Sequence, residues 1–106
     1  MPKYLIEASY TAQGVAGLAR EGGSGRREVV DSLVRGLGGR LESFYFAFGE
    51  VDAYVIADLP DNVTAGALAL AVNRSGSVKT ITVPLMTVEE VDQALKTNVN
   101  YRAPGG

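Results

Sequence analysis

The chain lacks both cysteine and histidine among its 106 residues. The absence of cysteine excludes disulfides, thiolate metal ligands and a cysteine nucleophile. The absence of histidine removes the commonest general base and the commonest ligand of metals and haem. Any catalysis would have to rest on Asp, Glu, Tyr, Lys, Arg, Ser or Thr. We therefore expect no metal site and no cofactor, and the composition favours a protein that is not an enzyme.

The chain also lacks a large excess of charge of one sign, and it lacks long apolar runs. The net charge is −2, which gives no reason to expect nucleic acid or a membrane surface as a partner. No apolar run approaches the roughly 20 residues of a membrane span. The first ten residues, MPKYLIEASY, are typical of a strand and not of a signal peptide. A soluble, cytoplasmic protein is the expectation.

What remains is the composition of one globular domain, with 46% hydrophobic and 21% charged residues. The apolar residues alternate in some stretches and recur at helical spacing in others, which separates strands from helices. Residues 97–106 show neither pattern and end in Pro-Gly-Gly, so we expect a domain over 1–96 and a flexible tail over 97–106. The expected elements are a strand over 4–9, helices over about 11–20 and 24–37, strands over 40–49 and 53–60, a helix over about 61–74, a strand over 78–85 and a short helix over 87–96.

Several boundaries have a local chemical cause. Thr11 and Asp61 can accept hydrogen bonds as helix N-caps, and Thr87 with Glu90 forms a capping-box pattern. The segment Glu21–Gly25, EGGSG, interrupts the first helical stretch. The resulting order is β-α-β-β-α-β with a split first helix and an additional C-terminal helix. This is the α+β, ferredoxin-like arrangement, with helices on one face of a four-stranded antiparallel sheet.

The strand patterns predict which side chains cover each face of the sheet. We expect Ile6, Ala8, Phe44, Phe46, Phe48, Ile81 and Val83 beneath the helices, and Glu7, Ser9, Leu41, Ser43, Tyr45, Tyr54, Ile56, Thr80 and Thr82 on the open face. This open face is too apolar to be left in water and too polar to be a sealed core. We therefore expect a homodimer, or a higher oligomer, in which two sheets pack face to face around a two-fold axis.

Three stretches of the chain carry a family resemblance: YTAQG at 10–14, GGRLESFYFAFGEVDAYVIADLPD at 38–61 and SVKTITVPL at 77–85. Together they resemble the GYD-domain family. The Gly-x-Tyr-Asp turn that gives the family its name corresponds to residues 49–52, where Gly49 and Asp52 match and Val51 replaces the tyrosine. The resemblance implies a dimeric α/β-barrel protein with a ferredoxin-like fold. It implies no particular reaction, because this superfamily includes monooxygenases, haem-handling enzymes and ligand-sensing domains.

Five residues are candidates for a ligand site: Glu7, Ser9, Tyr45, Asp52 and Tyr54. Asp52 is the most ambiguous, since its carboxylate can either brace the turn or sit beside Tyr45 at the rim of a site. Glu7 would be a potential base if water were excluded, but a salt bridge with Lys79 or a partner's arginine is the simpler interpretation. No catalytic residue is assigned.

The stretch GGSGRR at 22–27 could cradle an anion, because glycine-rich backbone at a helix start carries free N–H groups beside Arg26 and Arg27. It lacks the spacing and the lysine of a nucleotide loop, and a flexible break between helices explains it more simply. The leading hypothesis is a protein that binds a small organic molecule in a pocket at the open face of the sheet, with the ligand lying either between the sheet and the helices or between the two sheets of a dimer. Two alternatives stay open: a cofactor-independent oxygenase or isomerase using Glu7 or Asp52 as base, and a structural assembly module without a ligand.

Overall fold

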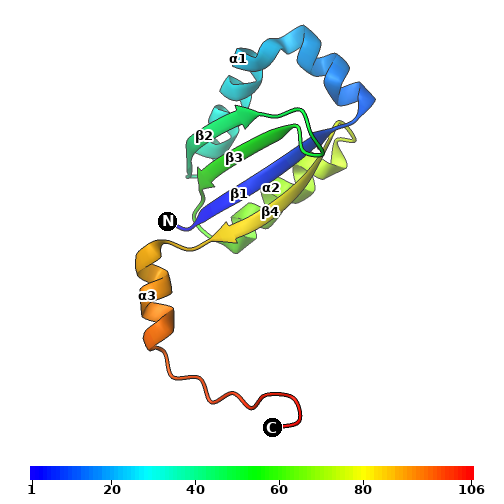
Figure 1. Ribbon diagram of the computed structural model, residues 1–106. Coiled ribbons are helices and arrows are strands. Elements are labelled where there is room, and N and C mark those ends of the chain that lie inside the picture. Colours follow the sequence, from blue (N-terminus) through cyan, green and yellow to red (C-terminus); the bar gives the residue numbers. More distant parts are fainter.

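A computed structural model describes all residues from 1 to 106 (Figure 1). The element order expected from the sequence is confirmed. The strands and helices are β1 (Lys3–Tyr10), α1 (Ala12–Gly36), β2 (Arg40–Phe46), β3 (Ala53–Asp58), α2 (Asn62–Arg74), β4 (Val78–Leu85) and α3 (Val88–Lys96).

Each helix begins at the cap that the sequence predicts. The side chains of Thr11 and Asp61 accept hydrogen bonds from the backbone N–H groups of Gly14 and Thr64. Thr87 and Glu90 form the reciprocal bonds of a capping box at the start of α3. The expected split of the first helix is a kink: α1 is helical on both sides of Gly22, whose φ of 81° lies outside the helical region.

The sheet has the strand order β2-β3-β1-β4, and its three strand pairs are all antiparallel. Both α1 and α2 lie on the same side of it (Figure 1). Helix α1 packs chiefly against β2, and α2 packs against β4. The two central strands therefore lie beneath the gap between the helices, while the opposite face of the sheet is open.

The core lies between the sheet and the helices, in two clusters. The larger cluster includes Tyr4, Val34 and Leu59, which are at most 1% exposed. Tyr4 also donates a hydrogen bond from its hydroxyl to Oδ1 of Asn62, at 2.5 Å. This bond ties the central strand β1 to the first residue of α2.

The face assignment of β4 was wrong. Ile81 is paired with Glu7 and is 56% exposed, so Ile81 and Val83 lie on the open face. Thr80 is paired with the buried Ala8, so Thr80 and Thr82 lie beneath the helices. The alternation in β4 separates the threonines from Ile81 and Val83 but does not say which set faces the helices, and the pairing with β1 decides it.

Two residues of the β2 region also differ from expectation. A register shift between Leu41 and Ser43 pairs Leu41 with the buried Ala57, which places Leu41 on the helix side. Phe48 is fully exposed, because β2 ends at Phe46 and the turn already begins at Ala47. The hairpin turn is therefore longer than the Gly49–Asp52 turn expected from the sequence. Tyr54 and Ile56, in contrast, lie on the open face as predicted.

Helix α3 lies apart from the sheet (Figure 1). Its apolar residues Val88, Val91 and Leu95 are 74%, 44% and 78% exposed, so the rest of the chain leaves most of its apolar face uncovered. Residues 97–106 continue beyond α3 without helix or strand. None of the helices has the length and apolar character needed to cross a membrane.

Candidate functional site

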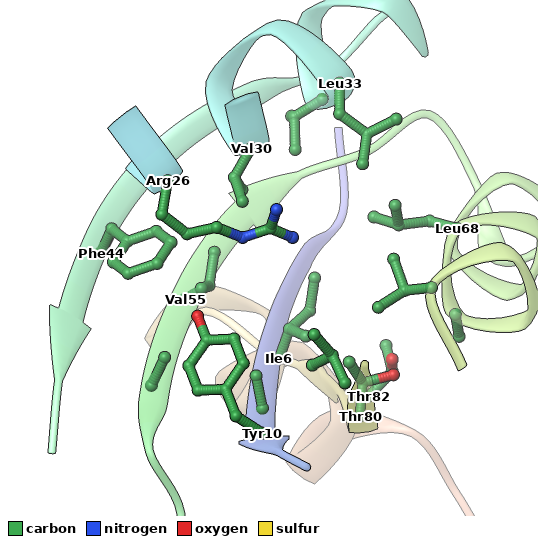
Figure 2. Close-up of a pocket in the computed structure, with 16 residues that line it drawn as sticks. Ile6, Tyr10, Arg26, Val30, Leu33, Phe44, Val55, Leu68, Thr80 and Thr82 are labelled. Atoms are coloured by element: carbon green, nitrogen blue, oxygen red, sulfur yellow. The ribbon is translucent and has the colours of Figure 1, made fainter. Parts of the chain in front are cut away.

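A cavity lies between the helix-covered face of the sheet and the two helices. We call it the chamber; its volume is about 60 Å³, and 13 of the 16 residues that line it are hydrophobic (Figure 2). Its floor is formed by side chains of all four strands, and its walls by the C-terminal half of α1 and by α2. The labelled lining residues are Ile6, Tyr10, Arg26, Val30, Leu33, Phe44, Val55, Leu68, Thr80 and Thr82.

The chamber exists because small side chains occupy the centre of the sheet. Ala8 on β1 and Ala53 on β3 are paired with each other and are 8% and 0% exposed. Each of these two residues carries only a methyl group, and the larger side chains that pack against them, Tyr10, Phe44 and Val72, leave a small space open above the sheet. The same alanines that permit close packing thus leave a void at the middle of the domain.

A second, more polar cavity adjoins the chamber, and we call it the vestibule. It has a volume of about 350 Å³ and shares Tyr10, Arg26, Val72 and Val78 with the chamber. Its other walls include the charged residues Arg20 and Glu21. Small-molecule sites occupy roughly 300–1,000 Å³ and combine an apolar lining with a few polar groups. The chamber and the vestibule together have this character.

Arg26 is the only charged residue that lines the chamber. It lies four residues beyond the Gly22 kink, and its guanidinium points into the cavity above Ile6 (Figure 2). Its one ion-pair partner is Glu21, at a long N–O distance of 3.8 Å, and the only other polar group that interacts with it inside the chamber is the Tyr10 hydroxyl. Arg26 therefore retains most of its hydrogen-bonding capacity within the cavity.

Tyr10 faces Arg26 from the end of β1, with its hydroxyl directed toward the arginine side chain (Figure 2). Burial raises the pKa of the Tyr10 hydroxyl, and the charge of Arg26 acts in the opposite direction. The phenol is therefore protonated at neutral pH and able to donate a hydrogen bond.

The structure separates the five predicted site residues from this cavity. Glu7 is paired with Tyr54, and Tyr54 with Tyr45, so these three form a row across the open face. Glu7 forms no ion pair within the chain, so the expected pair with Lys79 is not formed. The alternative, a pair with a partner's arginine, stays a prediction. The Ser9 hydroxyl donates a hydrogen bond to the carbonyl of Glu50, at 3.2 Å.

The carboxylate of Asp52 does not accept its hydrogen bond within the turn, as the turn-bracing interpretation expected. Oδ2 accepts a hydrogen bond of 2.8 Å from the backbone N–H of Tyr10, which belongs to β1 and not to the turn. The backbone of Asp52 is also held, since its N–H donates to the Ala8 carbonyl and its carbonyl accepts from Ala47. Asp52 therefore fixes the end of β1 at the point where the Tyr10 ring enters the cavity.

Sequence reasoning did not select Tyr10, and it named Arg26 only together with Arg27, as part of a possible anion cradle at GGSGRR. The signal for Arg26 was present in GGSGRR, where a cation at a helix start is unfavourable to the helix dipole. Tyr10 had no comparable signal, because a tyrosine at a strand end is common and its neighbour Arg26 is 16 positions away. No group of three or more acidic side chains is arranged to hold a metal ion.

The strand order, the antiparallel sheet and the two helices on one face define a ferredoxin-like α+β domain. The chain belongs to the GYD-domain family, since the model of the GYD domain matches residues 4–95 and so includes every strand and helix almost completely. The resemblance recognised in the sequence is thereby confirmed. No match is found among curated proteins.

Proposed function

We propose that this protein binds a small organic molecule in the chamber and vestibule between the sheet and the helices. The observation that supports the proposal is the apolar chamber beneath the helices, joined to a polar vestibule with Tyr10 and Arg26 at the junction. A monomeric domain gains no stability from such a void, since an unfilled cavity forfeits packing contacts. A ligand with an apolar portion would restore those contacts.

The open face of the sheet supports a second role, which we propose to be homodimerisation. Tyr45 and Ile81 are 71% and 56% exposed there, and Glu7 lies in the same row of residues. Two copies packed face to face would cover these apolar groups and place Glu7 near polar groups of the second copy. The predicted residues Glu7, Tyr45 and Tyr54 would then belong to the interface and not to the ligand.

The oxygenase or isomerase alternative gains no support from the cavity. Such a reaction needs a general base, and neither Glu7 nor Asp52 lines the chamber. The ionisable groups that do line it, Arg26 and Tyr10, are a cation and a protonated phenol. This pair is suited to binding and orienting a ligand rather than to removing a proton from it.

The experiment that tests ligand binding compares two alanines of α2. Ala69 lines the chamber, and Ala67 is exposed on the same helix. We would screen small organic molecules by thermal shift and map each stabilising molecule by its effects on the amide spectrum of ¹⁵N-labelled protein. Ala69→Phe fills the chamber and should abolish binding of a molecule located there, while Ala67→Phe should leave it unchanged. Binding that survives Ala69→Phe, or shifts confined to the open face, would contradict the proposed location.

A further inference from the structure

The charge of Arg26 indicates which class of ligand the cavity would accept. Burying a cation among apolar side chains is costly unless an anion compensates for it. The Arg26 side chain is 25% exposed, and the only carboxylate that pairs with it within the chain is Glu21, at 3.8 Å. It also lies near the start of the helical segment that follows Gly22, where the free N–H groups add positive potential.

Resting on the proposed function, we infer that the ligand is a short aliphatic monocarboxylate, held by Arg26 at the junction of chamber and vestibule with its alkyl chain in the chamber. Guanidinium and carboxylate match in a two-pronged geometry, with two parallel N–H to O bonds. The protonated hydroxyl of Tyr10, which faces Arg26, supplies a further donor for the carboxylate.

The charge balance of the vestibule selects one negative charge over two. The charged residues that line it are Arg20, Glu21 and Arg26, whose formal charges sum to one positive charge. Asp52, whose charge also acts on Tyr10, is already held by the backbone N–H of Tyr10. A carboxylate neutralises that charge. A phosphate dianion would leave a net negative charge in a partly enclosed site, which favours its exclusion.

The size of the chamber selects an alkyl chain over a ring. An engineered apolar cavity that accepts benzene has a volume of about 150 Å³, and the chamber has about 60 Å³. A flexible chain can place its terminal carbons in this space while its remaining methylenes follow the apolar residues Val72 and Val78 at the junction.

The test uses hexanoate and its uncharged isostere hexanamide, titrated by NMR into ¹⁵N-labelled wild-type protein, Arg26→Met and Arg27→Met. Methionine keeps the apolar stem of arginine without its charge, and the neighbouring Arg27 lines neither the chamber nor the vestibule. We expect hexanoate to bind wild type at least tenfold more tightly than hexanamide. Arg26→Met should remove this preference, and Arg27→Met should keep it. Amide spectra of the unliganded variants establish that both are folded.

The outcomes separate this inference from the function on which it rests. Equal binding of the two probes at the chamber, unaffected by Arg26→Met, overturns the anionic class while the proposed binding function stands. Absence of chamber shifts with both probes, together with absence of any stabilising molecule in the wider screen, overturns both. Benzenephosphonate serves as the dianionic and aromatic comparison, and binding tighter than hexanoate would overturn the selection of a monocarboxylate.

Discussion

The two faces of the sheet are made by alternate residues of the same strands, yet they differ in how completely the chain covers their side chains. On β3, Ala53 and Val55 are 0% and 4% exposed beneath the helices, while Tyr54 between them is 40% exposed. The side chains of the covered face pack against the helices of the same chain, except at the chamber. The open face has aromatic and aliphatic groups that no part of the chain covers. The difference shows that stability, ligand binding and assembly can be assigned to different faces.

A pair of tyrosines gives the largest expected contrast between the faces. Tyr4 is 1% exposed on the covered face, and Tyr45 is 71% exposed on the open face. Tyr4→Ala should lower the free energy of unfolding by about 3–5 kcal/mol, as for other large buried aromatic residues. Tyr45→Ala should change it by about 0.5 kcal/mol or less. Urea denaturation below the concentration at which the protein associates measures both, and similar losses would show that the faces are energetically alike.

An introduced charge tests the open face as an interface. Ile81→Lys should weaken dimerisation by about 1–2 kcal/mol, roughly tenfold in the dissociation constant, because the ammonium group would have to be buried against the second copy. Leu70→Lys is the matched control, since Leu70 is 72% exposed on α2. Sedimentation equilibrium measures association in each case. A wild-type protein that is monomeric at all accessible concentrations would refute the proposed dimer.

The smallest expected effect concerns Asp58, at the end of the open face beside Lys3. The hydrogen bond from Lys3 and the charges of Lys3 and Arg40 lower the pKa of the Asp58 carboxyl below its usual value. Because the pKa is lower in the folded than in the unfolded state, the stabilisation is fully present above pH 4–5, roughly, and is lost as the pH falls through the folded-state pKa. Asp58→Asn should therefore be less stable than wild type at pH 7, with a difference that vanishes in strong acid.

Urea denaturation between pH 2 and pH 7, roughly the range over which carboxyl groups titrate, follows this difference. Asp92→Asn on α3 is the control, because Asp92 is exposed and forms no ion pair within the chain. Its stability should follow that of wild type across the whole range. A difference between Asp58→Asn and wild type that is independent of pH would show that the ion pairs contribute nothing.

The sequence predicted those parts of the fold that depend on local chemistry. The caps at Thr11, Asp61 and Thr87 and the break at Gly22 each involve residues within four positions of one another, so their signals are contiguous. The orientation of β4 was mispredicted because it depends on distant partners. Thr80 faces the helices, where its N–H and hydroxyl both bond to Oδ1 of Asn73 on α2.

The cavity could not be predicted from the same patterns. It depends on the distance between α1 and α2, and the sequence pattern of one helix does not indicate where the other helix lies. Arg26 gave a weak signal through its unfavourable position at a helix start, but the direction of its side chain depends on the kink at Gly22. Asp52 was identified as a notable residue by its turn, while its partner Tyr10 lies 42 positions earlier in the chain.

The position of β1 within the sheet has a consequence for how the chain folds. Its partners are β3 and β4, so residues 3–10 obtain their complete set of strand hydrogen bonds only after residues 53–58 and 78–85 have been synthesised. The strand of this domain that is synthesised first is thus one of the last to complete its hydrogen bonds. Until then its unpaired edges are available to other chains, and its long-range pairings slow the search for the native state. Most of the domain must therefore be made before its sheet can close.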